Sequence, residues 1–217
     1  TAFNSLLSPF DAAGFHFNKP FLDKEIFWQG TLGGKAARLL YNKFPFARLH
    51  GLLVPEPERQ WPQMLTPELH GWAWECCATA NLPGLCLGYN SMGAGASVNH
   101  LHFQSFVHAG LPIQHPRFIH NGGDEAYPLP CLRFDDARAA WMQLDAFHQH
   151  NQPYNLVYKR NALYVIARVP QDNTRLSPAC KGYGWSEMAG VFNLFNRERY
   201  DTLNAERLTA ELASFAG

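Results

Sequence analysis

Hydrophobic positions recur in two periods along the chain, and they predict strands and helices in alternation. Short apolar runs bounded by Pro, Gly and Asn are typical of strands, since these residues end regular structure. Six such runs occur, at Ala37–Tyr41, Leu49–Val54, Leu85–Tyr89, Leu101–Val107, Asn155–Tyr158 and Leu163–Val169. The last two flank Arg160-Asn161 and predict a hairpin.

Three segments show the wider spacing of helices, each behind a residue suited to be an N-cap. Thr66 precedes Pro67 to about Ala80, Asp136 precedes a helix to about His148, and Asn204 precedes Ala205 to Phe215. The stretch Met188 to Phe195 fits either period. The resulting order predicts an α+β fold whose sheet is mainly antiparallel.

Length and composition predict a single compact domain, or at most two closely packed lobes. The chain has 217 residues, of which 47% are hydrophobic and 17% charged, so a substantial core can form. The stretch from 112 to 130 is rich in Pro, Gly and His and is the best candidate for a lobe boundary.

Charge and hydropathy exclude several classes of partner. Lys plus Arg equals Asp plus Glu at 18 each, with no basic run, so we expect no nucleic-acid partner and only local contacts to anions. No apolar stretch reaches the ~20 residues that span a bilayer. The first residues lack the pattern of a signal peptide. We therefore expect no membrane association and a cytoplasmic location.

The five cysteines, Cys76, Cys77, Cys86, Cys131 and Cys180, form no C-x-x-C pair. An odd number without that spacing argues against a disulfide framework or a zinc ribbon. The pattern Leu69, Trp72, Ala73, Cys76, Cys77 and Ala80 is that of a buried helix face. We expect reduced, structural thiols rather than metal or redox chemistry.

Candidate chemistry is concentrated in one segment, His100-Leu101-His102-Phe103-Gln104. On a strand, alternate side chains share a face, so His100, His102 and Gln104 point one way and Leu101 and Phe103 enter the core. A neutral imidazole is a competent nucleophile toward phosphorus. The Gly- and Ser-rich stretch before it can bring backbone N–H groups close to phosphate oxygens. Metal binding, chance exposure and ordinary packing of two histidines remain alternatives for this motif. His108 lies on the same face of the predicted strand and is a further candidate.

Gly95-Ala96-Ser97, two further residues and then His100-x-His102-x-Gln104 resemble the active-site motif of the galactose-1-phosphate uridylyltransferase branch of the histidine-triad (HIT) superfamily. The longer string from Gly88 to Gln104 is most similar to the GDP-hexose phosphorylases, those of GDP-L-galactose and GDP-D-glucose. Diadenosine-tetraphosphate phosphorylases are the near rival. The segments from Leu40 to Pro45 and His50 to Pro55 resemble their nucleotide-pocket strands, and Trp185 to Gly190 agrees with a family stretch.

The resemblance implies a HIT-like antiparallel sheet with packed helices, in two related half-lobes. The first, residues 1–125, carries the nucleotidyl-transfer motif, and residues 126–217 form a smaller lobe. The resemblance also implies that Met188 to Phe195 is a strand. No zinc is expected, because the Cys spacing of the uridylyltransferases is missing, and no other cofactor is implied. Many relatives are dimers, so a homodimer is possible.

The resemblance further implies a two-step nucleotidyl transfer. His102 attacks the α-phosphorus and carries the nucleotidyl group, while His100 supports it and Gln104 hydrogen-bonds the phosphate. Gln in place of a third His favours transfer to phosphate over hydrolysis, since an amide has no titrating proton for the leaving group. The remaining candidate substrate contacts are Gly95 and Ser97 for the phosphates, Asn42, Lys43 and His50 for the nucleoside, and Asn155, Arg160 and Arg168 for the sugar phosphate or phosphate.

Three functions remain open at this point. The first is phosphorolysis of a nucleoside-diphosphate hexose, giving GDP and hexose 1-phosphate from GDP-hexose and phosphate. The second is phosphorolysis or hydrolysis of a dinucleoside polyphosphate such as diadenosine tetraphosphate. The third is a non-catalytic nucleotide-binding protein. Glu187 matches an acidic family position to which the resemblance assigns no role.

Overall fold

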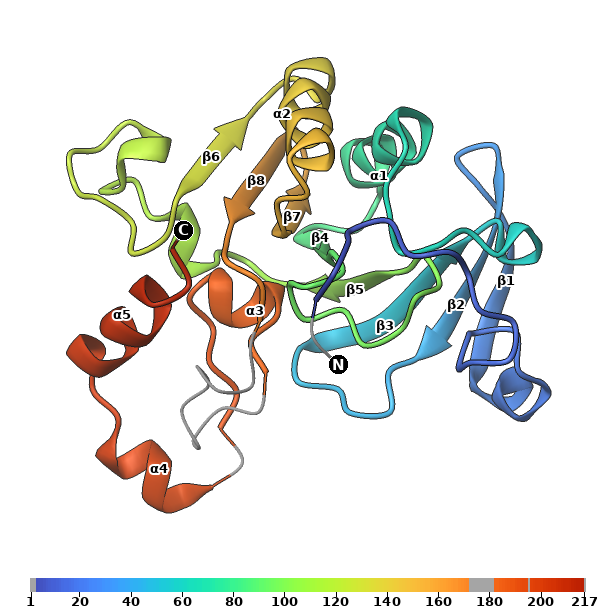
Figure 1. Ribbon diagram of the computed structural model, residues 1–217, viewed down its shortest axis with the longest axis horizontal. Coiled ribbons are helices and arrows are strands. Elements are labelled where there is room, and N and C mark those ends of the chain that lie inside the picture. The colour runs from blue at the N-terminus through green and yellow to red at the C-terminus, as the bar shows by residue number, and fades with distance from the viewer. Residues whose placement is uncertain (1–2, 172–181, 195, 217) are drawn as a thin grey trace.

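The eight strands in the described part of the chain form one antiparallel sheet, as a computed structural model shows (Figure 1). The structure describes residues 3–171, 182–194 and 196–216. The strands lie in the order β1-β2-β3-β5-β4-β7-β8-β6. Their bounds are Ile26–Leu32 (β1), Lys35–Tyr41 (β2), Arg48–Pro55 (β3), Leu85–Asn90 (β4), Phe103–Val107 (β5), Cys131–Phe134 (β6), Tyr154–Lys159 (β7) and Ala162–Ala167 (β8).

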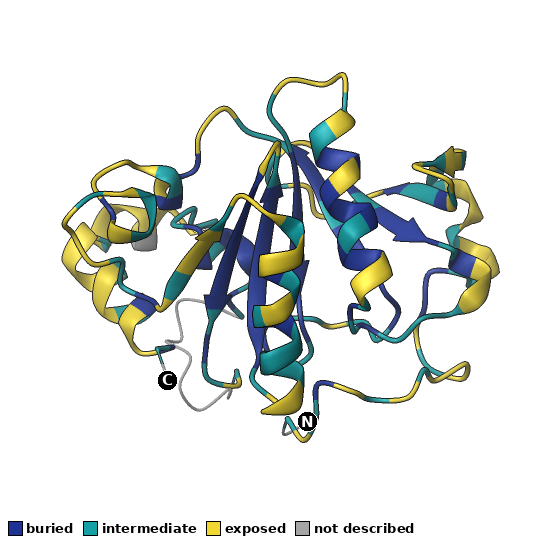
Figure 2. Cartoon of the chain, turned by 90° about the horizontal axis from the view of Figure 1, so that it is seen from above, coloured by how far each residue is buried: buried dark blue, intermediate teal, exposed yellow. Residues whose placement is uncertain are grey.

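Helices α1 (Pro67–Thr79) and α2 (Ala137–Gln149) cover one face of this sheet, with their buried sides turned to the strands (Figure 2). Both begin where the sequence predicts, since Thr66 Oγ1 accepts a hydrogen bond from Leu69 N and Asp136 Oδ1 accepts one from Ala139 N. Their apolar stripes and alternate residues of the central strands form the largest core cluster. We call this side of the sheet the helix face.

The opposite face, which we call the site face, is covered by the two ends of the chain. Alternation separates the faces: Leu156 and Tyr158 of β7 belong to the helix-face core, and Val157 between them belongs to the other. The C-terminal elements α3 (Trp185–Met188), α4 (Arg197–Thr202) and α5 (Ala205–Ala213) lie below β7 and β8 in Figure 1. The N-terminal segment packs on β2 and β3 through Phe17. Short 3-10 turns occur at Pro20–Glu25, Pro57–Arg59, Pro112–Gln114 and Ile119–Asn121.

The α+β class and the antiparallel sheet are confirmed, whereas several element bounds differ from those predicted. Strands β1 and β6 were not predicted, and the strand predicted to start at Leu101 begins at Phe103. The expected strand from Met188 to Phe195 is wrong. Met188 ends helix α3, and residues 191–194 form no regular element.

The predicted lobe division at residue 125 runs through the sheet, with β1 to β5 before it and β6 to β8 after it. The central pairing of β4 with β7 joins the two parts, so they share one sheet rather than meeting as separate bodies. The division into related half-lobes stays a prediction.

The cysteines of α1 lie in the core, as predicted. Cys76 and Cys77 are buried, and burial raises the pKa of the Cys76 thiol to about 12. Cys180 lies outside the described residues.

In the part of the chain that the structure describes, no helix combines the length and the apolar character needed to cross a bilayer.

Candidate active site

His102 lies directly before β5, and its hydrogen bond fixes which ring nitrogen is free. Its Nδ1 is 2.8 Å from the carbonyl oxygen of His100. A carbonyl oxygen only accepts, so Nδ1 carries the proton and donates. The lone pair of the neutral ring is therefore on Nε2, and no described residue forms a hydrogen bond with that atom. Burial lowers the His102 pKa to about 4, so the ring is neutral at pH 7.

His100 has the opposite tautomer. Its Nδ1 is 3.1 Å from the backbone N of Phe17, which only donates, so Nδ1 accepts. The proton is on Nε2, which hydrogen-bonds to the Pro57 backbone. Burial, followed by repulsion from His102, lowers the His100 pKa to about 4. His100 is thus occupied on both nitrogens and supports its neighbour through its carbonyl.

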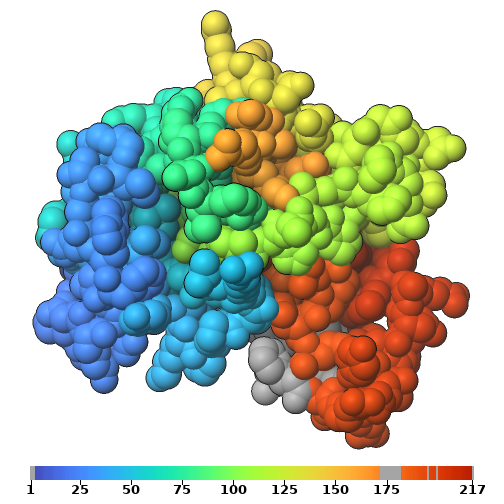
Figure 3. Space-filling view, turned by 180° about the vertical axis from the view of Figure 1, so that it is seen from behind, coloured from blue at the N-terminus to red at the C-terminus, as the bar shows by residue number. Residues whose placement is uncertain are grey.

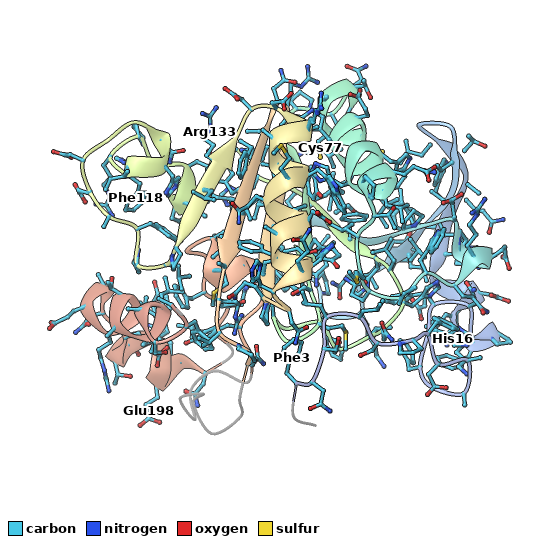
Figure 4. The ribbon with its side chains drawn as sticks, turned by 45° about the horizontal axis from the view of Figure 1, so that its top comes forward. Phe3, His16, Cys77, Phe118, Arg133 and Glu198 are labelled. Carbon is cyan, nitrogen blue, oxygen red and sulfur yellow. The ribbon has the colours of Figure 1, made fainter. Side chains whose placement is uncertain are left out.

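Aromatic residues of the N-terminal segment cover this pair. The Phe17 ring centroid is 4.9 Å from that of His102 and 5.7 Å from that of His100, and Phe10 meets His100 edge-on at 5.3 Å. Only 1% of His100 and 8% of His102 remain exposed. The covering segment includes His16, labelled in Figure 4. The apolar pattern of the sequence did not indicate this cover, because it forms no regular strand or long helix.

Gln63 holds the backbone of His102 and was missed by the sequence analysis. Its Oε1 accepts from His102 N at 2.9 Å, and its Nε2 donates to His102 O at 3.2 Å and to Asn90 O at 2.9 Å. Asn99 ties the same region together, since its Oδ1 accepts from Gln63 N and its Nδ2 donates to Ser8 O and Pro9 O. These bonds replace strand pairing at 100–102.

Gln104 lies on the site face, where His50 and Trp185 meet it. Its Oε1 is 2.8 Å from Trp185 Nε1 and 3.0 Å from His50 Nε2. Phe46 N donates to His50 Nδ1 at 3.2 Å, which places the His50 proton on Nε2. Asn42 Nδ2 also lies 3.0 Å from His50 Nε2, but this contact joins two N–H donors in that tautomer and is not a hydrogen bond. The structure therefore brings Asn42, His50 and Gln104 together, and burial lowers the His50 pKa so that its ring stays neutral.

The loop that carries Gly95 and Ser97 closes over residues from the far end of the chain. Gly95 has φ +94°, and a Cβ there would lie 2.6 Å from the Tyr183 carbonyl oxygen, so only glycine fits. Ser97 is exposed. Both residues stay candidates for phosphate contacts.

Asn155 and Arg168 are fully buried, which changes how their predicted roles are understood. Asn155 Nδ2 donates to Asn90 Oδ1 and Ala94 O, while Arg168 Nη1 donates to Tyr183 O at 2.7 Å. Burial lowers the Arg168 pKa to about 10. Arg168 Nε is buried without a partner among the described residues. In this arrangement the two side chains hold the 90–95 loop against the 183–185 segment, and neither is open to a substrate.

His108 and Arg160 lie apart from the histidine pair, and Lys43 is on the surface. Strand pairing places Gln104 opposite Gly88 and Val107 opposite Leu85, so His108 is at the far end of β5. Arg160 lies at that same end, beyond Lys159, and donates to Ala80 O. Lys43 is exposed, 5.9 Å from the Phe44 ring centroid. Arg160 is therefore separated from the site by the length of β7.

Glu187 serves the segment that carries Trp185. Its Oε2 accepts from Gly184 N at 2.9 Å, in front of helix α3. Burial raises the Glu187 pKa. Among the described residues, no group of three His, Cys, Asp or Glu side chains is arranged to hold a metal ion.

A cavity of about 870 Å³ adjoins the site beside Phe46. It lies between the β2–β3 loop and the C-terminal segment, two regions that are neighbours on the face seen in Figure 3. Phe46 packs edge-on against His50 at 4.3 Å, so the cavity is next to the Gln104 group. Its lining comprises Pro45, Phe46, Gly190, Phe192, Asn193, Leu194, Tyr200, Asp201, Leu203 and Leu208.

Comparisons with known proteins show which proteins this chain resembles. Residues 1–106 match the family model described as GDPGP1-like, N-terminal domain. Human GDP-D-glucose phosphorylase 1 is 37% identical over 118 residues, which are 51% of this chain and 31% of that protein. Arabidopsis thaliana GDP-L-galactose phosphorylase 2 is 39% identical over 75 residues, 35% of this chain and 17% of that protein. The chain thus spans about a third or less of these relatives.

Solved structures confirm the fold. Yeast Ap4A phosphorylase Apa2 superimposes with a TM-score of 0.64 at 18% identity, covering 83% of this chain and 72% of the yeast chain. Its complex with Ap4A gives 0.63 over 84% of this chain and 74% of the yeast chain. The N-terminal half of this protein therefore resembles the GDPGP1-like N-terminal domain of the GDP-hexose phosphorylases, and the chain has the HIT-like fold of the yeast Ap4A phosphorylase.

Proposed function

We propose that the protein is a nucleotide phosphorylase that works through a nucleotidyl-histidine on His102. The observation that carries the proposal is the state of this ring. Nδ1 is bound to the His100 carbonyl, which leaves a neutral Nε2 as the nucleophile. The hydrogen bond from Nδ1–H also stabilises the positive charge that the ring acquires when Nε2 attacks phosphorus.

The first step breaks the bond between the α-phosphorus and the oxygen that bridges it to the β-phosphorus. His102 Nε2 forms the new bond to the α-phosphorus, and the electron pair of the broken bond leaves with the hexose 1-phosphate. In the second step an oxygen of inorganic phosphate attacks the α-phosphorus, the P–N bond breaks, and the pair returns to Nε2. GDP is released and the enzyme is restored.

A GDP-hexose is the substrate that we propose. The support is the match of residues 1–106 and the names of the relatives, which are phosphorylases of GDP-D-glucose and GDP-L-galactose. Gln104 supports transfer to phosphate over hydrolysis, because the departing hexose 1-phosphate needs no proton from an acid at this position. Gly95 and Ser97 remain the proposed phosphate contacts.

A second candidate is phosphorolysis of a dinucleoside polyphosphate. It is favoured by the fold, which matches yeast Ap4A phosphorylase over more of this chain than any of the relatives named above covers. The first chemical step is the same, and only the leaving group differs.

The experiment is covalent capture. Incubation with GDP-glucose or GDP-galactose without phosphate should add one GMP to the peptide that contains His102, and added phosphate should release it as GDP. AMP on that peptide after incubation with diadenosine tetraphosphate, with no adduct from GDP-hexoses, would select the second candidate. Calorimetric binding of these nucleotides without an adduct would instead indicate a non-catalytic nucleotide-binding protein.

A further inference from the structure

The Gln104 amide is held in one of its two orientations, and the partners that hold it come from separate parts of the chain. Its Oε1 faces the indole Nε1 of Trp185 and the ring Nε2 of His50. The indole N–H only donates. His50 Nε2 carries the ring proton, since its Nδ1 accepts from Phe46 N. Two donors therefore meet at this atom, and only the amide oxygen satisfies both.

The consequence is a fixed direction for the amide N–H groups. With the oxygen occupied twice, Gln104 turns its NH2 away from Trp185 and His50, and within the described residues that NH2 has no partner. An amide rotated by 180° would place N–H against two N–H donors, which costs at least the two hydrogen bonds. Gln104 is thus kept as a donor, the role that a phosphate oxygen requires.

Trp185 reaches this position because the surrounding backbone leaves room for its ring. A Cβ on Gly88 would lie 2.5 Å from the indole, so any larger residue displaces the ring. Phe106 stacks on the indole at 4.1 Å and 17°. Asn90 Oδ1 accepts from Trp185 N at 2.7 Å. Three neighbouring contacts from β4 and β5 therefore fix the ring and its N–H.

We propose that Trp185 is a positioning residue of the nucleotidyl transfer, which acts by holding Gln104 so that its amide NH2 faces the α-phosphate. This inference rests on the proposed function for its reaction, but the amide orientation does not. Trp185 does not touch the reacting atoms, and its effect passes entirely through Gln104.

The test is a double-mutant cycle on the rate of nucleotidyl-His102 formation. Trp185→Phe keeps an aromatic ring and removes the N–H, so we expect the rate of nucleotidyl-His102 formation at saturating substrate to fall about 10-fold. In steady-state turnover the loss should appear in kcat, with little change in KM. In a Gln104→Ala background the same change should have no further effect. A merely structural role for Trp185 would lower the rate by the same factor in both backgrounds, and that result would overturn the proposal.

Trp72→Phe is the matched control. Trp72 is also buried, and its Nε1 donates to Leu32 O at 2.8 Å, but it lies on α1 on the helix face. This variant loses the same ring portion and the same type of hydrogen bond, so we expect its rate to stay within about 2-fold of the parent. A drop in the Trp72 variant equal to that of Trp185→Phe would mean that the site responds to any lost indole.

The orientation itself is measured without turnover. In the free protein, the Trp185 indole proton should show only weak nuclear Overhauser effects to the Gln104 side-chain NH2, because the oxygen lies between them. A strong effect there would overturn the proposal even if the enzyme is active. Absence of any nucleotidyl adduct in the parent protein, with the weak effect observed, would instead refute the proposed function and leave the Gln104 geometry standing.

Discussion

Buried histidines lie on both faces of the sheet, yet only one of those described above presents a free ring nitrogen. On the helix face, His70 Nδ1 meets Tyr158 Oη at 2.8 Å and its Nε2 donates to the Ala137 carbonyl oxygen. On the site face, His102 uses only Nδ1. Burial lowers the pKa of both rings. The difference teaches that a low pKa does not distinguish the two histidines, whereas the free Nε2 of His102 does, and this is the nitrogen that we propose as the nucleophile.

The largest expected effect separates the two faces by activity. His102→Ala should reduce nucleotidyl transfer by more than about 1000-fold, because no other group supplies the attacking nitrogen. The melting temperature should change little, since Gln63 holds the backbone rather than the ring. Turnover and thermal melting on one preparation check this. Residual activity near the parent level would assign the nucleophile elsewhere.

His70→Ala should have the opposite outcome. The change leaves the Tyr158 hydroxyl and the Ala137 carbonyl without their partner and opens a cavity beneath α1, at a cost of about 2–4 kcal/mol of unfolding free energy. Urea unfolding measures this loss. Turnover per folded molecule should remain that of the parent, and a selective loss of kcat in a fully folded sample would contradict the comparison.

Acid should weaken both faces together. His100, His102, His70 and His148 all have lowered pKa values, chiefly through burial. In the unfolded chain these histidines bind protons near pH 6.5, whereas in the folded protein they do not. The full free energy of unfolding is therefore present above pH 6.5 and decreases as the pH falls. For each histidine of the site pair, His100 and His102, the slope is about 1.4 kcal/mol per pH unit down to about pH 4. Urea midpoints between pH 7 and 5 should show it, with a shallower slope in His102→Ala.

The smallest effect concerns the end of the sheet away from the histidine pair. Arg160→Ala should alter turnover by less than about 2-fold, because its side chain reaches the end of α1 rather than the His102 region. Steady-state kinetics with GDP-hexose and phosphate decide this. A large rise in the KM for phosphate would return Arg160 to the binding site.

The sequence predicted the elements whose signal is local. The caps at Thr66 and Asp136 locate α1 and α2, and period-two apolar runs locate the central strands. Strands β1 and β6 escaped because they are the edge strands, with exposed residues such as Phe27 and Leu132 that blur the alternation. The segment after Met188 escaped because its burial depends on packing against distant parts of the chain.

The same limit applies to the site. His100, His102 and Gln104 are close in sequence, so the motif is enough to predict that they belong to one site. Gln63 and Trp185 are 39 and 81 residues from their partners His102 and Gln104, and no period or motif links such positions. For Gln63 the signal is the burial of a polar side chain, which only the structure shows. Trp185 lies in a stretch that resembles the family, but that resemblance assigns it no partner.

The indole on Gly88 also determines how the protein can be divided. A fragment ending at residue 106 contains the histidine pair, His50 and Gln104, but lacks one of the two donors that orient the amide. Such a fragment would need the remaining polypeptide supplied in trans, docked through Asn90 and the stacked Phe106, before its glutamine is set. Split-protein reconstitution would then report assembly of the Gln104 site itself rather than mere association of two halves.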